Sequence, residues 1–257
     1  MPQIKDSLYE QLNPLTTVAG QRFVDDFSGD TPDVLRWGFG YQDSTTGNLA
    51  SMGDSVNGGL LLTTGTAVDN QAIYMSFMTG TSLTGSDNGT MTTIPIRPFS
   101  SGLCNMIATV RINEDITTHG NQFAGFTESG RGDCAGDNMA GFYHHRTKGN
   151  FHLRTSNSGG SQNDTTTGVT ADNEWHTIKI LSNVTADPTP AGTGVSLVLD
   201  GVLKATNTTA IGYFSENVAP LFSTQRSLLS SGASSMNISY TSCLTTCCCG
   251  SANKIRL

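Results

Sequence analysis

The sequence that decides the fold reads EWHTIKI at residues 174–180 and VSLVLDGVL at residues 195–203. In both stretches apolar and polar residues alternate with a period of two, as they do in strands that bury one face. The dipeptide Asp200-Gly201 is typical of a two-residue hairpin turn, because a type I′ turn requires positive φ at both central positions. The stretch therefore predicts antiparallel strands joined by a tight turn.

Composition extends this prediction to the whole chain. The protein has 257 residues, of which only 14% are charged and 29 are glycine. Thr, Ser, Asn and Gly suit short strands joined by many turns, whereas a helical protein would be dominated by Ala, Glu, Lys and Leu. A chain of this length can form one all-β domain with enough interior to fold without disulfide bonds.

Charge and hydropathy narrow the classes of partner. The net charge is −7 and the pI is near 5.0, and no basic cluster offsets this locally. Nucleic-acid binding is disfavoured, because it depends on Lys and Arg that neutralise phosphates. No segment approaches the roughly 20 apolar residues of a membrane span, and the N-terminus has no signal-peptide core. We therefore expect a protein made in the cytoplasm, with no nucleic acid or membrane as partner.

Strand-like segments run through most of the chain. We expect an N-terminal arm at residues 1–20 and a single β-sandwich domain at residues 21–257. Gly, Asn and Ser runs separate the predicted strands, as in a sandwich. These strands are residues 21–27, 35–40, 59–63, 72–78, 103–112, 122–128, 140–144, 151–155, 175–181, 195–200, 202–206, 219–222 and 235–241.

The order of several short motifs resembles a known family. The motifs are FVDDF at 23–27 with Trp37, ATVRI at 108–112, FAGFTES at 123–129, GFY at 141–143, FHL at 151–153, EWH at 174–176, LDG at 199–201 and MNISY at 236–240. Together they resemble the concanavalin A-like (laminin-G-like jelly-roll) modules, and FAGFTES resembles a strand of such modules in tailed-bacteriophage structural proteins. The resemblance covers roughly residues 21–242. It implies a two-sheet antiparallel β-sandwich of the jelly-roll type.

The resemblance also implies a function. We expect a non-enzymatic virion structural protein of a tailed phage, a capsid decoration protein that binds the major capsid protein or other virion proteins and forms a homo-oligomer. Its localisation would be the virion, after synthesis in the host cytoplasm. The alternative is a carbohydrate-binding, lectin-like module of a tail fibre or adhesion protein, with host-surface glycans as partners.

Enzymatic activity is not expected from the acidic residues. Glycosidases use two converging carboxylates, and the glucanase relatives carry them in a strand of the type E-x-D-x-E. Here Glu114 and Asp115 are adjacent and would point to opposite faces, while Glu128 stands alone on its strand. No Gly-x-Ser-x-Gly elbow and no phosphate-binding glycine loop is present.

One loop has the composition of a calcium site. Residues 130–138 contain Asp133, Asp137 and Asn138 among many glycines, and oxygen donors of this kind suit a hard cation. An ordinary turn explains the same composition, so two interpretations stay open: a bound calcium ion, or no cofactor. His144 and His145 are consecutive and would face opposite sides of a strand, which disfavours one tetrahedral metal site.

Aromatic and sulfur-containing residues are interpreted as structural. Trp175 and Phe126 suit the core of a sandwich, although the phase that Trp175 shares with Thr177 and Lys179 leaves its burial open. The chain has six cysteines, four of them between Cys243 and Cys249. We expect reduced thiols, with an intermolecular disulfide in the assembled particle as a further hypothesis.

The arm gives the first testable prediction. Deleting residues 1–20 should abolish incorporation into the particle and leave the sandwich folded, because attachment of a decoration protein arises from extended contacts and symmetry. Incorporation is measured by quantifying the protein in purified particles. Normal incorporation of the shortened protein would contradict the role of the arm.

Overall fold

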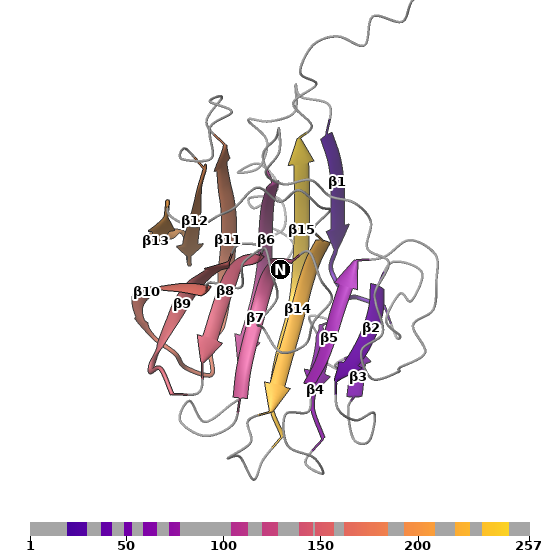
Figure 1. The fold of residues 1–257 in the computed structure, drawn as a ribbon. Helices are drawn as coiled ribbons and strands as arrows, with labels where there is room; N and C mark the ends of the chain where they lie inside the picture. Colours follow the sequence, from indigo (N-terminus) through magenta and orange to yellow (C-terminus); the bar gives the residue numbers. More distant parts are fainter. Residues whose placement is uncertain are drawn as a thin grey trace, which may run out of the picture.

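The structure is a computed structural model, and it describes residues 20–29, 37–42, 49–52, 59–65, 72–77, 104–112, 120–127, 139–145, 147–156, 162–184, 193–208, 219–226 and 233–246. These residues form fifteen strands and no helix (Figure 1). The strands are β1 (Gly20–Asp25), β2 (Trp37–Gln42), β3 (Leu49–Met52), β4 (Leu60–Thr63), β5 (Ala72–Phe77), β6 (Cys104–Ile112), β7 (Gly120–Thr127), β8 (Met139–His145), β9 (Asn150–Ser156), β10 (Gln162–Thr170), β11 (Trp175–Val184), β12 (Thr193–Leu199), β13 (Val202–Asn207), β14 (Ala219–Arg226) and β15 (Ser235–Thr246).

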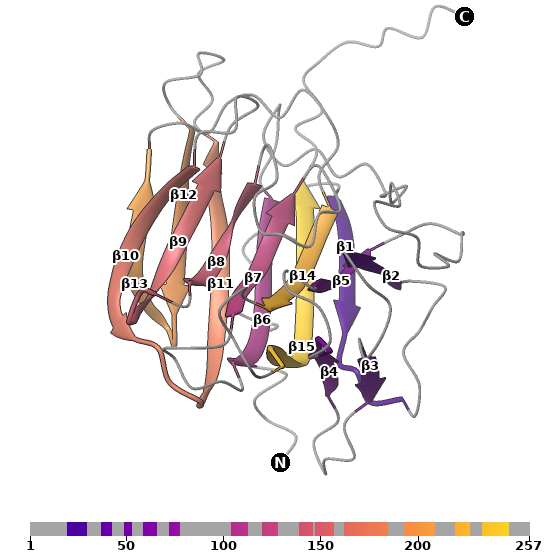
Figure 2. The same cartoon turned by 60° about the horizontal axis from the view of Figure 1, so that its bottom comes forward.

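The strands make two antiparallel sheets that pack face to face (Figures 1 and 2). The eight-stranded sheet has the order β13-β12-β11-β6-β15-β4-β3, and β1 also pairs with β15. The seven-stranded sheet has the order β10-β9-β8-β7-β14-β5-β2 and lies in front in Figure 1. The predicted two-sheet antiparallel sandwich is confirmed.

The long strand β15 has room for two partners on the same edge. Its first part, Ser235 to Ile238, pairs with β4, and its last part, Thr241 to Thr246, pairs with β1. Its other edge pairs with β6, with a register shift between Ile238 and Tyr240. A shift of this kind reverses which residues face inward, so Met236 and Ile238 before it and Cys243 after it all reach the core.

Side chains alternate along each strand, so one face of each sheet turns toward the core between the two sheets. On β6 the side chains of Met106, Ala108, Val110 and Ile112 all join the core cluster, as the sequence predicts. Strands of both sheets contribute to it. Among the largest buried side chains of this cluster are Trp37, Phe126, Phe142, Phe151, Phe222, Leu60 and Leu62. The interpretation of Phe126 as a core residue is therefore confirmed.

The hairpin at Asp200-Gly201 forms as predicted. It joins β12 to β13, and φ is 51° at Asp200 and 81° at Gly201. Two strands were not predicted: β3, which has four residues, and β10, with the sequence QNDTTTGVT. Both are edge strands, and β10 lacks the alternation of apolar residues that identifies a half-buried strand.

The first strand ends earlier than predicted. β1 stops at Asp25, and Phe27 has φ of 48° and turns its ring into the core. The carboxylate of Asp25 accepts the backbone N–H of Phe27 at 2.8 Å and the indole N–H of Trp37 at 2.7 Å. The rings of Phe27 and Trp37 are 5.7 Å apart between centroids. One carboxylate thus fixes the turn after β1 against β2 of the other sheet.

The described residues do not test the predicted division into an N-terminal arm and a single sandwich domain. The predicted N-terminal arm lies, apart from Gly20, outside the described residues. Within the described part of the chain, there is no helix with the length and hydrophobicity of a membrane span.

Two glycines allow β7 and β8 to approach closely. Gly125 pairs with Gly141 across these strands, on the face that points away from the core. A Cβ atom on Gly141 would lie 2.6 Å from the carbonyl oxygen of Ala124 and 2.7 Å from Cζ of Phe123. The Phe123 ring therefore occupies the space that the two missing side chains leave.

This contact predicts the effect of one methyl group. Gly141→Ala should lower the free energy of unfolding by about 2 kcal/mol, because backbone and a buried ring would both have to shift. The matched control is Gly149→Ala, since nothing lies within 4 Å of a Cβ there. Urea denaturation of both variants tests the contact, and equal stability of the two would contradict it.

Candidate functional site

Most of the charged side chains on the described strands of the seven-stranded sheet lie on its outer face. On β8 and β9 the residues that alternate with the core residues Phe142, Phe151 and Leu153 point outward. We call the resulting group the Arg154 cluster. It consists of Tyr143 and His145 on β8, Lys148 in the β8–β9 turn, His152 and Arg154 on β9, and Asp164 on β10.

Arg154 is fixed on both its edge and its flat face. Its Nε donates to Oδ1 of Asp164 at 2.7 Å and its Nη2 donates to Oδ2 at 2.8 Å, which is the two-point geometry that suits a guanidinium and a carboxylate. The guanidinium carbon lies 3.4 Å from the centroid of the Tyr143 ring, so a cation–π contact adds to the ion pair. Arg154 is therefore held in one orientation.

Lys148 adds a second cation to the same carboxylate. Its Nζ donates to Oδ2 of Asp164 at 2.7 Å. Burial alone would raise the pKa of Asp164, but the hydrogen bonds from Arg154 and Lys148 outweigh it and lower the pKa to about 2. Burial and the charge of Lys148 also lower the pKa of His152. At neutral pH the cluster thus holds two cations and one carboxylate.

Polar groups continue along this face toward β14. Nδ1 of His145 accepts the backbone N–H of Thr147 at 3.2 Å, so in neutral His145 the proton is on Nε2. On the adjacent strands the amide of Asn121 donates to that of Gln225 at 3.0 Å. Asn121 pairs in register with both Gln225 and His145. Imidazole and amide groups therefore form a row across three strands.

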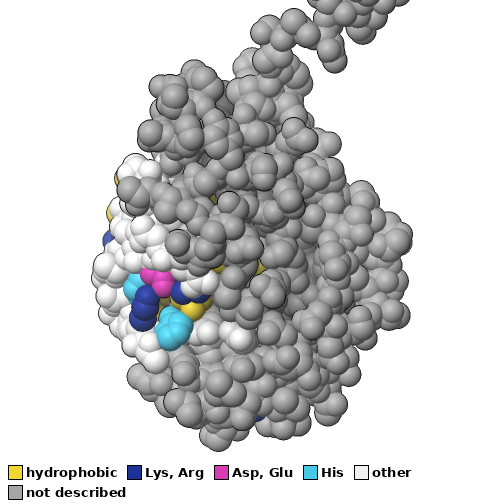
Figure 3. Space-filling model, in the orientation of Figure 1, with side chains coloured by type: hydrophobic (Ala, Val, Ile, Leu, Met, Phe, Trp, Pro, Cys, Tyr) yellow, Lys and Arg dark blue, Asp and Glu magenta, His cyan; other side chains and the backbone are white. Residues whose placement is uncertain are grey.

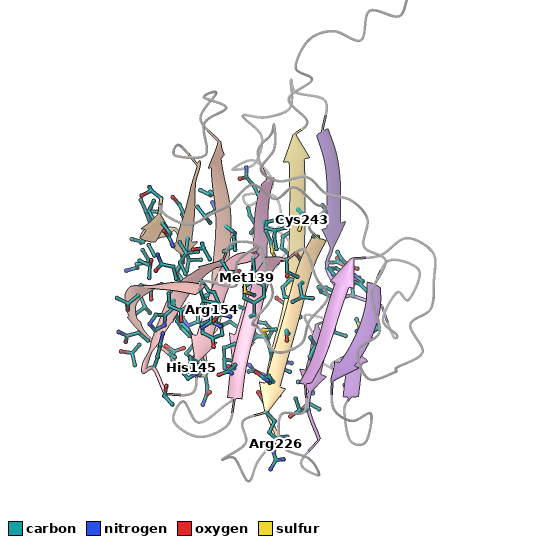
Figure 4. All side chains as sticks on the ribbon, viewed as in Figure 1. Met139, His145, Arg154, Arg226 and Cys243 are labelled. Carbon is teal, nitrogen blue, oxygen red and sulfur yellow. The ribbon has the colours of Figure 1, made fainter. Side chains whose placement is uncertain are left out.

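The cluster is visible on one side of the molecule. Figure 3 shows Lys/Arg, Asp/Glu and His side chains close together over the strands of the seven-stranded sheet. Figure 4 labels Arg154 and His145 near each other on β9 and β8. The cluster combines fixed hydrogen-bond donors and acceptors with a net positive charge. Tyr143, His152 and Arg154 are buried, and the side chain of Lys148 is more exposed than those of Arg154 and Asp164.

The sequence-predicted calcium residues are not part of this cluster. Asp133, Asp137 and Asn138 lie outside the described residues, so the calcium site stays a prediction. Within the described ranges, no group of three or more His, Cys, Asp or Glu side chains could hold a metal ion. His144 points inward, toward Gln122, while His145 points outward, as their adjacency predicts.

Cys243 is a core residue. It is buried in the eight-stranded sheet, and burial raises the pKa of its thiol to about 12 (Figure 4). A thiol with this pKa is neither a ready metal ligand nor a reactive nucleophile at neutral pH. Cys247, Cys248 and Cys249 lie outside the described residues, so the intermolecular disulfide remains a hypothesis for them.

Trp175, whose burial the sequence leaves open, is not a core residue. Its side chain is 40% exposed and lies on the outer face of the eight-stranded sheet. The guanidinium carbon of Arg111 is 5.1 Å from the ring centroid. The phase of Trp175 with Thr177 and Lys179 was the correct signal, because that side of β11 faces outward.

Comparison of the structure with solved structures shows which fold this is. The chain matches a protein of unknown function from Shewanella oneidensis MR-1 with a TM-score of 0.59 at 14% identity, over 98% of this chain and 97% of that one. It matches the carbohydrate esterase of Shiga toxin-encoding bacteriophage phi24B with a TM-score of 0.52 at 15% identity, over 89% and 99%. It matches peanut lectin with a TM-score of 0.53 at 12% identity, over 89% and 98%.

The fold is a concanavalin A-like jelly roll. The resemblance predicted from the ordered motifs is thereby confirmed at the level of the fold. No protein-family model matches the sequence, and a comparison with curated protein sequences finds no significant match.

A second cluster explains the EWH and LDG motifs in structural terms. Nδ1 of His176 is 2.7 Å from Oδ2 of Asp200 and Nε2 is 2.8 Å from Oδ1 of Asp172. Asp200 also accepts the backbone N–H of Thr177 at 2.9 Å. Burial alone would lower the pKa of His176, but the hydrogen bonds to Asp200 and Asp172 raise it above 6.5. The His176 side chain thus holds the β12–β13 turn against β11.

The pKa of His144 is shifted in the opposite direction, downward. Its Nδ1 lies 2.7 Å from Oε1 of Gln122, and its Nε2 is buried without a hydrogen-bond partner among the described residues. Burial, followed by the charges of His145 and His152, lowers the pKa of His144 to about 4. The rings of His144 and His176 both contact the ring of Phe151, with centroid distances of 6.1 Å and 5.1 Å and edge-on geometry.

These two pKa shifts predict stability losses on both sides of pH 6.5. His176 binds its proton more tightly when folded, so its contribution is complete below pH 6.5 and is lost as the pH rises through its higher folded pKa. His144 resists protonation when folded, so stability falls by about 3 kcal/mol as the pH drops from 6.5 to about 4.

Urea denaturation across this pH range separates the two residues. His176→Gln should remove the loss on the alkaline side only, and His144→Gln should reduce the loss on the acid side only. An unchanged pH profile in either variant would contradict the assignment of that histidine.

Proposed function

We propose that the protein is a carbohydrate-binding module and that the Arg154 cluster is its binding site. The observation that carries this proposal is the ion pair of Arg154 and Asp164, which is buried against Tyr143 on the face of the sheet that points away from the core and lies beside the more exposed Lys148. Sugar hydroxyls both donate and accept hydrogen bonds, so they suit a surface that offers guanidinium, ammonium, imidazole, amide and carboxylate groups side by side. Groups that are already held in place lose little conformational entropy on binding.

The comparisons support this proposal through the functions of the similar structures. Peanut lectin and the carbohydrate recognition domain of Emp47p share the fold, and so does the phage carbohydrate esterase. The functions in question belong to those proteins, because similarity at 12–15% identity shows a shared fold and nothing more. The Arg154 cluster is what links this chain to glycan binding.

The described strands of the seven-stranded sheet carry too few carboxylates for glycoside hydrolysis, which favours glycan binding over hydrolysis. Across the described strands of the seven-stranded sheet, Asp164 is the one acidic residue. Hydrolysis of the two-carboxylate type needs a second carboxylate and a general acid that keeps its proton near neutral pH. A pKa of about 2 leaves Asp164 without a proton to donate.

We further propose that this module belongs to a tailed-phage virion, where it decorates the capsid. The support is the motif resemblance described above and the structural similarity to a protein of bacteriophage phi24B. In that setting the seven-stranded sheet would face outward, where glycans of the host surface can reach the Arg154 cluster.

Glycan binding gives the next prediction. On an array of immobilised glycans the protein should bind a defined subset, and Arg154→Gln should reduce that binding at least tenfold, because a hydrogen-bonded charge contributes about 1.5–3 kcal/mol. Lys148→Ala should weaken the same binding less, since its side chain is more exposed. The matched control is Thr109→Ala on β6, which leaves the seven-stranded sheet unchanged.

Circular dichroism would show that each variant is folded. Binding to no glycan, or equal binding by Arg154→Gln and Thr109→Ala, would contradict the proposal. Release of reducing sugar from a bound glycan would show that the module is an enzyme.

A further inference from the structure

The hydrogen bonds of the Arg154 cluster leave donors of Lys148 for a ligand. The one carboxylate of the cluster, on Asp164, accepts from Nε and Nη2 of Arg154 and from Nζ of Lys148. A lysine ammonium has three N–H donors and accepts no hydrogen bond. Asp164 takes one of these donors, so two N–H groups of Lys148 are left for oxygen atoms that a ligand supplies.

The same three side chains carry a net positive charge. The low pKa of Asp164 keeps it ionised at neutral pH, and its single negative charge faces the two positive charges of Arg154 and Lys148. The neighbouring His152 responds to this excess. Burial, followed by the charge of Lys148, lowers its pKa, although the charge of Asp164 acts in the opposite direction. The charge that the cluster offers to a ligand is therefore positive.

Lys148 is the accessible cation of the cluster. Its side chain is 39% exposed, whereas those of Arg154 and Asp164 are 8% and 12% exposed. The turn around it is open, because Thr147 before it is exposed and nothing lies within 4 Å of a Cβ atom built on Gly149 after it. A ligand that approaches the β8–β9 turn thus meets the ammonium of Lys148 first.

We infer that the glycan bound at the Arg154 cluster is acidic, and that its carboxylate or sulfate group accepts hydrogen bonds from Nζ of Lys148. This inference rests on the proposed glycan-binding function. Hydrogen bonds between charged groups are roughly twice as strong as those between neutral groups, so an anionic oxygen gains more from the ammonium than a sugar hydroxyl does. Arg154 has a positioning role, since it holds the Asp164 carboxylate that orients Lys148.

The overall charge of the protein would not produce this preference. The chain carries a net charge of −7, and a field of that sign disfavours acidic ligands in general. A preference for an acidic glycan over its neutral form therefore reports on local positive charge. It makes Lys148 the residue that determines specificity at this site.

An array of neutral, carboxylated and sulfated glycans tests the inference first. The glycans that the full chain binds should be acidic, and the class of the tightest one distinguishes a carboxylate from a sulfate. Isothermal titration calorimetry then compares that glycan with its neutral form, the methyl ester or the desulfated sugar. The acidic form should bind about fivefold more tightly, as expected for a partly exposed ion pair.

Variants of Lys148 assign the preference to this side chain. Lys148→Gln should reduce the preference to less than about twofold, because the amide still donates a hydrogen bond but carries no charge. Lys148→Arg should retain the preference, since it keeps the charge. The matched control is Lys179→Gln on β11, which changes the net charge equally but lies on the other sheet and should leave the preference unchanged. Thermal unfolding would show that each variant is folded.

The outcomes separate this inference from the proposal on which it rests. Tightest binding to a neutral glycan, equal affinity for the acidic and neutral forms, or the same loss of preference in Lys148→Gln and Lys179→Gln would overturn the inference and leave glycan binding in place. Binding to no glycan would overturn the proposed function, and the inference with it.

Discussion

Each strand of this sandwich can give only one of its two sides to the core. Side chains alternate across a strand, and the two sheets bury their inner faces against each other. Phe142 and Leu153 point inward, so Tyr143, His152 and Arg154 must point outward. On strands, chemistry that involves a partner is therefore confined to the two outer faces, and in this protein those faces differ.

The outer face of the seven-stranded sheet carries a fixed polar cluster over β8 to β10, beside the buried ring of Phe123 on β7. A buried ion pair contributes little net stability once desolvation is counted, but it fixes orientation well. The pair between Arg154 and Asp164, with Tyr143 beneath the guanidinium, has this character. On the other sheet, Trp175 and Leu203 are exposed instead. The fixed polar cluster is why we assign glycan binding to the first face.

The sequence predicts the framework better than the site. Alternation in EWHTIKI and VSLVLDGVL, together with Asp200-Gly201, was sufficient for the strands and the hairpin, because these signals are local. The bonds of His176 to Asp200 and of Arg154 to Asp164 depend on strand register, which alternation alone does not give. Asp164 was missed for a further reason. It lies on β10, a polar edge strand without a periodic apolar signal.

The most direct test of the central claim is a nuclear magnetic resonance titration with the glycan that binds most tightly on the array. Binding at the Arg154 cluster predicts that the largest changes in backbone amide shifts fall on β8, β9 and β10, while β11 to β13 change little. The largest changes on the eight-stranded sheet, or no changes at saturating glycan, would contradict the account.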